Sequence, residues 1–193
     1  MRVALFGGSF NPPHVGHLLA VAYLRAVAPV DAVWLMPAHR HAFGKQLAPW
    51  EDRLQMCGAV ASVFTGVEVT DIEAHVPGEG RTVDTVDALR ARYPTHIFRL
   101  VLGTDLLEQL SAWKDPQRLL ALAPPLVVGR TGYPKPDKLP DGAEWLGDVF
   151  LPEVSSTQVR AALAGEDDIE ALVPAAVRRI IEERGLYRMA AAT

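Results

Sequence analysis

Two histidines three residues apart follow a pair of glycines and a pair of prolines near the start of the chain. The segment reads Gly7-Gly8-Ser9-Phe10-Asn11-Pro12-Pro13-His14-Val15-Gly16-His17. The glycines predict a tight turn that a ligand can approach closely, and the prolines predict the entry to a helix. On the first turn of that helix His14 and His17 share one face, and Gly16 places no side chain between them. A single histidine would more often cap a helix or pack in a core, but the whole arrangement is typical of a phosphate site at a helix N-terminus.

A second group of polar residues lies near the end of the chain. It reads Ser155-Ser156-Thr157-Gln158-Val159-Arg160. The spacing of Ser155 and Gln158 is that of a capping box, which predicts that a helix begins here. Ser156 and Thr157 add hydroxyl groups at the same end, and Arg160 adds a planar cation one turn further on. Many capped helices carry an exposed arginine, so it is only beside the first segment that this one predicts the other half of a polyphosphate clamp.

The elements that must position these residues alternate between strand and helix. Short apolar runs predict strands over 2–6, 31–36, 67–69, 96–102 and 126–128, and longer segments predict helices over 15–28, 50–64, 82–93, 105–110 and 116–122. This alternation predicts an α/β fold, a Rossmann-like doubly wound parallel sheet with helices on both faces. Ligands of such sheets bind at the carboxyl ends of the strands. We therefore expect the site just after Phe6, Met36, Leu102 and Val128.

Length and composition favour a single domain over residues 1–193. Residues 123–152 hold six of the fifteen prolines and little periodicity, so we interpret them as a connecting segment and not a domain boundary. An apolar stripe between Pro174, expected at the first helical position, and Gly185 predicts a final helix. Residues 155–188 then form a helical C-terminal part packed on the sheet.

Charge and cysteine content exclude several classes of protein. Nineteen Lys and Arg against 23 Asp and Glu give a formal net charge of −4, so no bulk positive field attracts nucleic acid or anionic lipid. The single cysteine, Cys57, excludes an internal disulfide and a Cys-based zinc cluster, and we interpret it as a small buried hydrophobe. No apolar run is long enough for a signal peptide or a membrane span. We expect a cytoplasmic protein; whether it forms a homo-oligomer stays open.

The two polar segments together resemble the nucleotidylyl transferase superfamily and, within it, the bacterial nicotinate-nucleotide adenylyltransferase family. The likeness runs from Met1 to about Tyr187. Three further stretches also resemble that family: Arg81-Thr82-Val83-Asp84-Thr85-Val86, Gly103-Thr104-Asp105 with Leu110 and Trp113, and Leu186-Tyr187-Arg188.

The resemblance implies transfer of AMP from ATP to nicotinate mononucleotide, giving deamido-NAD and pyrophosphate without a covalent intermediate. It implies that His14, His17 and Arg160 are catalytic and hold the triphosphate. Mg²⁺ would assist, bound through the ATP phosphates and not by protein side chains. The ATP-binding residues that it implies are Gly7, Gly8, Ser9, Phe10, His14, Gly16, His17, Gly103, Asp105, Ser156, Thr157 and Arg160.

The resemblance also implies a pyridine-nucleotide site made of Asn11, Arg40, Lys45, Thr82, Thr85 and Trp113. Trp113 would stack on the pyridine ring, although core packing would also explain it. Backbone N–H groups near Thr82 and Thr85 would receive the nicotinate carboxylate, unless these residues simply cap their helix. Asp105 would take ribose hydroxyls of the adenosine, or cap the helix that follows.

Residues 37–45 depart from the family pattern. Many members have Pro-Pro-His followed by Lys or Arg there, which contacts the mononucleotide phosphate. Here the basic side chains are His39, Arg40, His41 and Lys45, and the sequence does not decide which one meets the phosphate. A metal bound by His39 and His41 has no third ligand in support. The departure leaves open the choice between nicotinate and nicotinamide mononucleotide.

Two other functions compete with this interpretation. Phosphopantetheine adenylyltransferase has a similar His-x-Gly-His and Ser-Ser-Thr-x-x-Arg, but normally lacks the preceding Pro-Pro. The other alternative is a nucleotide-binding sensor without turnover. Against the sensor, every position expected to face the polyphosphate carries a competent side chain.

Overall fold

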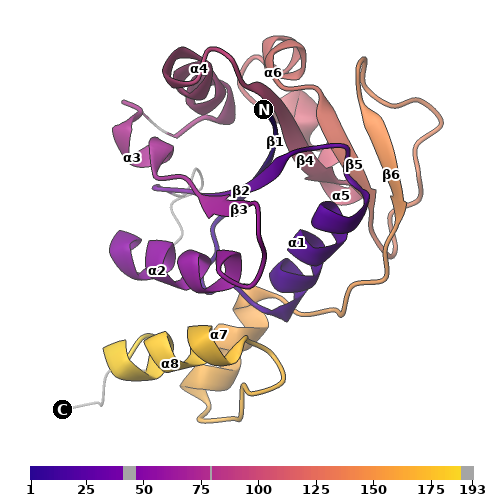
Figure 1. Ribbon diagram of the computed structural model, residues 1–193. Helices are drawn as coiled ribbons and strands as arrows, with labels where there is room; N and C mark the ends of the chain where they lie inside the picture. Colours follow the sequence, from indigo (N-terminus) through magenta and orange to yellow (C-terminus); the bar gives the residue numbers. More distant parts are fainter. Residues whose placement is uncertain (41–46, 79, 188–193) are drawn as a thin grey trace.

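The protein is built on a six-stranded sheet that lies between two layers of helices (Figure 1). The computed structural model describes residues 1–40, 47–78 and 80–187. The strands are β1 (Arg2–Gly8), β2 (Ala32–Pro37), β3 (Val67–Val69), β4 (Ile97–Gly103), β5 (Pro125–Gly129) and β6 (Glu144–Asp148). The helices are α1 (Val15–Val27), α2 (Trp50–Ala61), α3 (Ile72–His75), α4 (Thr82–Arg92), α5 (Thr104–Leu107), α6 (Pro116–Leu122), α7 (Ser156–Ala164) and α8 (Ala175–Arg184), with a 3-10 turn η1 (Leu110–Ala112).

The strand order locates the switch point of the sheet. The order is β3-β2-β1-β4-β5-β6, and every neighbouring pair is parallel. The predicted doubly wound sheet is therefore confirmed. The direction of winding reverses between β1 and β4, and in such sheets this switch point opens a crevice at the carboxyl ends of the two strands. Gly8 ends β1 and Gly103 ends β4, so the glycine–histidine segment begins at that crevice.

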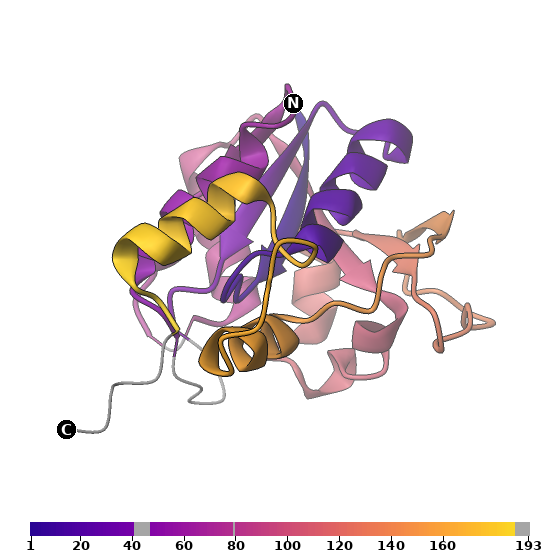
Figure 2. The ribbon, with the colours of Figure 1, turned by 90° about the horizontal axis from the view of Figure 1, so that it is seen from below.

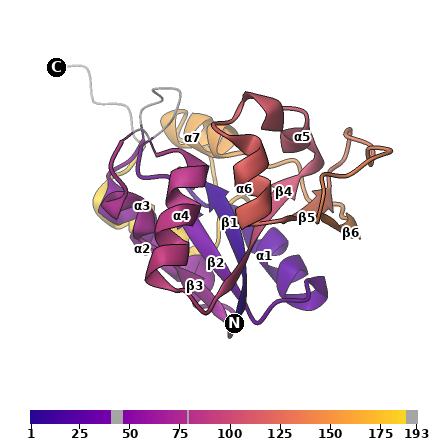
Figure 3. The ribbon, with the colours of Figure 1, turned by 90° about the horizontal axis from the view of Figure 1, so that it is seen from above.

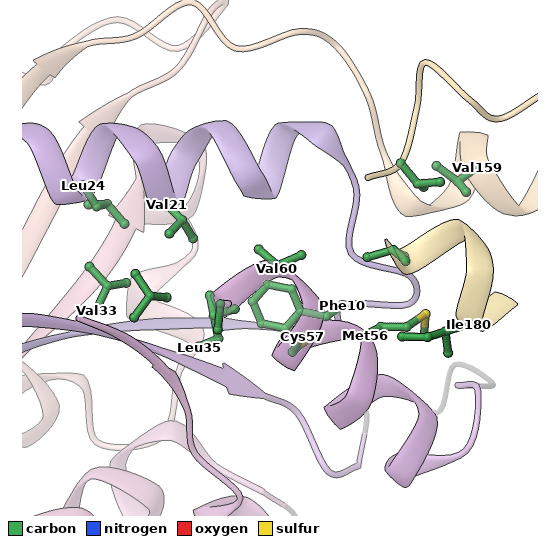
Figure 4. Close-up of a cluster of buried hydrophobic side chains, with 14 of the residues drawn as sticks. Phe10, Val21, Leu24, Val33, Leu35, Met56, Cys57, Val60, Val159 and Ile180 are labelled. Carbon is green, nitrogen blue, oxygen red and sulfur yellow. The ribbon is translucent and has the colours of Figure 1, made fainter. Parts of the chain in front are cut away.

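One apolar layer joins the sheet to α1, α2, α7 and α8. Its centre is Phe10, which is 1% exposed and lies among side chains such as Leu35, Cys57 and Val60 (Figure 4). Cys57 is fully buried, as predicted for a small hydrophobe, and burial raises the pKa of its thiol. Viewed from below, α8 lies against α2 (Figure 2). The side chains of Val159 in α7 and Ile180 in α8 are buried in this same layer. The C-terminal helices therefore share the hydrophobic core of the sheet.

The other face of the sheet is covered by α3, α4 and α6, as the view from above shows (Figure 3). Val86 and Leu89 of α4 and Leu119 of α6 are completely buried there. The central strands β1, β2, β4 and β5 are covered on both faces, which is why their sequences are largely continuous hydrophobic runs instead of alternating ones.

The sheet extends one strand further than the sequence predicted. Residues 123–152, interpreted as a connecting segment, contain β6, which pairs with β5 at the edge of the sheet. A buried cation organises this edge: the Arg99 guanidinium donates to the carbonyl oxygens of Pro124, Pro125 and Gly142. The interpretation was wrong because β6 depends on these long-range bonds and is poor in apolar residues of its own.

Three smaller differences concern helices. Helix α3 was not predicted, and the helix expected over 105–110 is divided into α5 and η1. Pro174 is the N-cap of α8 and not its first residue, while Gly185 ends the helix in the left-handed conformation with φ of 61°. Among the residues that the structure describes, no helix combines the length and apolar character needed to cross a membrane.

Candidate active site

The junction between β1 and α1 places the histidine pair at the switch point. Gly7 and Gly8 are the last residues of β1 and pair with β2, so the predicted glycine turn is wrong. Gly8 is needed for space, because a Cβ there would lie 3.2 Å from the ring of Phe10. The chain turns instead at Phe10, whose φ is 44°. Since the Phe10 side chain is buried, a contact between this residue and ATP would have to come from its backbone.

The two imidazoles lie against each other at the start of α1. His14 is the N-cap, His17 lies one turn on, and their ring centroids are 3.8 Å apart. The backbone N–H of His14 donates to Nδ1 of His17 at 3.2 Å, which leaves the proton of the neutral His17 ring on Nε2. Gly16 makes this arrangement possible, because a Cβ there would lie 3.1 Å from two atoms of the His14 ring.

Both histidines are held in the neutral form. Burial, reinforced by the charge of Arg130, lowers the pKa of His14 from 6.5 to about 4. Burial, with smaller contributions from His14 and Arg130, also holds the pKa of His17 well below its usual range. The pair therefore presents hydrogen-bond donors at pH 7, not charges, and a bound anion would favour their protonation.

Helix α7 brings the second polar segment to the same place. The predicted capping box is confirmed: the N–H of Gln158 donates to Ser155 Oγ at 3.2 Å, and the N–H of Ser155 donates to Gln158 Oε1 at 2.7 Å. Ser156 Oγ donates to the carbonyl oxygen of Pro12 at 2.8 Å. Arg160 donates to the carbonyl oxygen of Asn11 at 2.7 Å. The two segments, far apart in sequence, are thus joined directly.

Thr157 completes this end of the site by accepting a bond from Arg160 at 3.2 Å. Asn11, predicted to bind the pyridine nucleotide, is 2% exposed. Its side-chain oxygen accepts from the N–H of Ala48 and from the hydroxyl of Tyr187, both at 2.9 Å. Asn11 therefore holds together the histidine segment, the chain before α2 and the end of the C-terminal helix. Ser9 lies between the end of β1 and this junction.

An ion pair lies at the carboxyl ends of β4 and β5. One partner, Asp105, was predicted from the sequence, and the other, Arg130, was not. Asp105 lies in the first turn of α5, and its Oδ2 is 2.6 Å from Arg130. Gly103 is the N-cap of α5 and keeps this space open, because a Cβ there would overlap Asp105 Oδ1. Asp105 thus pairs with Arg130 and does not cap its helix. Arg130 was missed, although it follows β5 at the edge where ligands were expected.

A buried arginine fixes the loops that surround the histidine pair. Arg53 is 1% exposed, and its guanidinium donates to four carbonyl oxygens, those of Ser9, Ala38, His39 and Ala48. These carbonyls follow β1 and β2 or precede α2. Nothing in the sequence marked Arg53 as special, since an arginine in the first turns of a helix is usually solvated.

A cavity beside Trp113 lies at the start of α4. It has a volume of about 510 Å³ and is lined by Pro77, Gly78, Arg81, Asp84, Ala112, Trp113 and Lys114. Trp113 is half-buried and packs against the second apolar layer, which bears out core packing, while its stacking on a pyridine ring stays a prediction. Thr82 is the first residue of α4, and Arg81 and not Thr82 is its N-cap. Trp113 and two residues at the start of α4, Arg81 and Asp84, therefore line the same cavity.

Thr85 points away from this cavity. It is completely buried, its hydroxyl donates to Glu73, and its N–H is bonded to the carbonyl oxygen of Arg81. The expectation that the N–H group of Thr85 receives a carboxylate is therefore wrong. Burial raises the pKa of Glu73 from 4.5 to about 7, partly offset by its bonds to the N–H of His39 and to Thr85 and by the charge of Arg53.

A second cavity, of about 450 Å³, shares Pro77 and Gly78 with the first and is lined by His39 and Arg40. Arg40 is exposed and donates to the carbonyl oxygen of Gly78 at 3.5 Å. Lys45 and His41 lie outside the described residues, so their predicted roles stay predictions. Within residues 1–40, 47–78 and 80–187, no three His, Cys, Asp or Glu side chains are arranged to hold a metal ion.

A histidine pair at the switch point, with Arg160 bonded to the same segment and Arg130 close enough to lower the pKa of both histidines, is typical of a nucleotide-binding protein of the doubly wound α/β class. The cytidylyltransferase-like family matches residues 5–162 of this chain. A probable nicotinate-nucleotide adenylyltransferase of Anaeromyxobacter sp. (strain K) is 46% identical over 190 residues, 97% of each chain. The corresponding protein of Myxococcus xanthus (strain DK1622) is 44% identical over 97% of this chain and 95% of its own.

Solved structures agree in fold. The nicotinic acid mononucleotide adenylyltransferase of Plasmodium falciparum, complexed with NaAD, has a TM-score of 0.79 at 18% identity and covers 96% of this chain and 97% of its own. This chain is a member of the cytidylyltransferase-like family and, within it, of the nicotinate-nucleotide adenylyltransferases.

Proposed function

We propose that this protein transfers AMP from ATP to nicotinate mononucleotide, releasing pyrophosphate and forming deamido-NAD, a step of NAD biosynthesis in the cytoplasm. The observation that carries the proposal is the meeting of the histidine pair, Arg160 and Arg130 at the switch point of the sheet. The similarity of nearly the whole chain to curated nicotinate-nucleotide adenylyltransferases supports it.

The residues at the switch point suit adenylyl transfer more than hydrolysis through a side-chain nucleophile. Phosphoryl-type transfer needs in-line positioning and stabilisation of the leaving group more than covalent chemistry. When the bond between the α-phosphorus and the oxygen that bridges it to the β-phosphorus breaks, charge gathers on the pyrophosphate. We assign the stabilisation of that charge to His14, His17 and Arg160, aided by Arg130. The attacking group is a phosphate oxygen of the mononucleotide, so no protein atom needs to form a bond.

Arg160 and Arg130 each have a partner that ATP would replace or share. Arg160 donates to the carbonyl oxygen of Asn11, and Arg130 pairs with Asp105. We assign Asp105 to the ribose hydroxyls of ATP, in which case Arg130 would turn toward the phosphates. Arg160 is therefore already held beside the histidine segment, which reduces the conformational entropy that it loses on binding.

Magnesium would enter with ATP. Mg²⁺ usually keeps several waters and binds substrate phosphates instead of an all-protein cage. The side chains around the histidine pair are donors and cations, a set that fits phosphate oxygens and not a bare metal ion. Bound through those phosphates, Mg²⁺ would neutralise part of the charge on the triphosphate.

The acceptor would occupy the two neighbouring cavities, which share Pro77 and Gly78 in their walls. We assign the pyridine ring to the cavity beside Trp113, with the indole face against the ring. Thr82 follows Arg81, which lines this cavity, and is assigned to the same end of α4. We assign the mononucleotide phosphate to Arg40, which lines the second cavity. Lys45 is a second candidate. Asn11 is assigned a positioning role, because its side-chain oxygen already has two partners.

The test is identification of the products. Purified protein would be incubated with ATP, Mg²⁺ and nicotinate mononucleotide, and the products separated by chromatography and weighed by mass spectrometry. We expect equal amounts of deamido-NAD and pyrophosphate, and their loss in His17→Asn. Formation of ADP, or of AMP without a dinucleotide, would contradict the proposal.

A further inference from the structure

The cavity beside Trp113 carries an ion pair in its wall. Lys114 Nζ lies 3.0 Å from Oδ1 and 2.8 Å from Oδ2 of Asp84. Asp84 belongs to the first turn of α4, and Lys114 directly follows Trp113 in the segment between η1 and α6. The contact therefore joins two parts of the chain that line the cavity.

We propose that this pair makes the cavity selective for an acidic pyridine ring over the corresponding amide. The proposal rests on the proposed function, because it takes the cavity as the place where the ring binds. An uncompensated Asp84 carboxylate in the wall would repel a ring carboxylate. Lys114 removes that repulsion, and among the described residues its ammonium donates only to Asp84. An ammonium has three N–H groups, so one stays available for the ligand.

The positive charge on which the preference depends is that of Lys114. A ring carboxylate would accept a charge-assisted hydrogen bond from the Lys114 ammonium, and such a bond is stronger than one to the neutral oxygen of an amide. Arg81 also lines the cavity but has contacts of its own, so the argument depends on the Asp84–Lys114 pair and not on that residue.

The Asp84–Lys114 pair contributes little to the stability of the free protein. The Lys114 side chain is 56% exposed and that of Asp84 34%, and ion pairs so open to water contribute little to stability. A ring that fills the cavity excludes water and strengthens the interactions among the charges that remain. The effect of the pair is therefore expected on binding and not on folding.

A second ion pair, between α4 and a residue of α6 four positions after Lys114, provides a matched control. Arg118 lies 2.8 Å from Asp87, one turn further along α4, with exposures of 57% and 35%. Neither Arg118 nor Asp87 lines the cavity. Breaking this pair removes a similar surface contact and leaves the charges around the ring unchanged.

The experiment measures kcat/KM for nicotinate mononucleotide and for nicotinamide mononucleotide at saturating ATP and Mg²⁺. Two unit charges about 6 Å apart at an effective dielectric constant near 20 interact strongly enough to change affinity about a hundredfold, and salt reduces this. We expect Lys114→Met to lower the acid-to-amide ratio of kcat/KM about tenfold to a hundredfold, mainly through KM for the acid. Asp84→Asn should keep or raise the ratio, and the double variant should recover most of the loss.

Arg118→Met should leave the ratio as in the wild type. The proposal is overturned if Lys114→Met keeps the wild-type ratio, if Arg118→Met changes it equally, or if Asp84→Asn abolishes the acid preference. Thermal melting of each variant checks that the fold is retained. Failure of the proposed function is a different result, since the wild type would then release no pyrophosphate with either mononucleotide.

Discussion

Replacing Gly16 with alanine separates the position of the histidine pair from the stability of the helix that carries it. A Cβ at position 16 would lie 3.1 Å from Cε1 and Nδ1 of His14, where ordinary contacts begin near 3.4 Å. The ring would have to move by a few tenths of an ångström, and His17, with its centroid 3.8 Å away, blocks one direction. A displacement of 1 Å in a catalytic group can cost about a hundredfold in rate. For this smaller shift we expect a loss of about tenfold in kcat, or about 1.4 kcal/mol.

The Gly16→Ala variant should lose activity without a matching loss of stability. Alanine in a helix is more favourable than glycine by about 1 kcal/mol, which offsets the strain against His14. The melting temperature should therefore stay within about 4 °C of the wild type. Gly58→Ala in α2 is the control, because nothing lies within 4 Å of the added Cβ, and it should keep full activity.

Pyrophosphate release at saturating substrates gives kcat, and calorimetry gives the melting temperature. Wild-type kcat in Gly16→Ala would refute the reasoning, since it would mean that the placement of His14 does not limit the reaction. A fall in melting temperature far beyond the expected range would instead mean that helix α1 was disrupted.

Three further predictions concern charged side chains. Arg160→Ala should raise KM for ATP at least tenfold and change KM for the mononucleotide little, because its guanidinium lies beside the histidine segment; the reverse order in initial-rate kinetics would assign it to the acceptor. Arg130→Met should raise KM for ATP and also raise the pKa of His14 above about 4, because a nearby cation is lost; NMR titration showing an unchanged pKa would contradict this. Glu73 has a pKa of about 7 in the fold against 4.5 ordinarily, so the stability from its neutral form is complete below about pH 4.5 and is lost as the pH rises to about 7. As the pH rises through that range, the free energy of unfolding of Glu73→Gln should therefore increase relative to that of the wild type, by on the order of 2–3 kcal/mol at pH 8. Urea unfolding at pH 5 and pH 8 measures this difference, and an equal difference at both pH values would rule the prediction out.

Local signals predicted much of the fold and the helix start that carries Ser155 and Arg160. The capping box of Ser155 and Gln158 depends on residues three apart, and it is formed as expected. The continuous apolar runs predicted the buried parallel strands, because a strand covered on both faces needs no polar side. The rule on strand ends then indicated the edge of the sheet at which the His14–His17 pair and the Asp105–Arg130 ion pair lie.

Features that depend on distant contacts were not predictable. Strand β6 needs the bonds of Arg99 to carbonyl groups far along the chain. Arg53 becomes a buried cation only when the loops after β1 and β2 bring their carbonyl oxygens to it. The inward orientation of Thr85 depends on Glu73 of α3, a helix too short to leave a periodic signal.

The most direct test of the central claim is a comparison of pyrophosphate release with three acceptors offered separately, each with ATP and Mg²⁺. The acceptors are nicotinate mononucleotide, nicotinamide mononucleotide and phosphopantetheine. We predict the highest kcat/KM with nicotinate mononucleotide, a lower value with the amide, and none with phosphopantetheine. Release with none of the three, despite measurable ATP binding, would contradict the enzymatic account and indicate a nucleotide sensor.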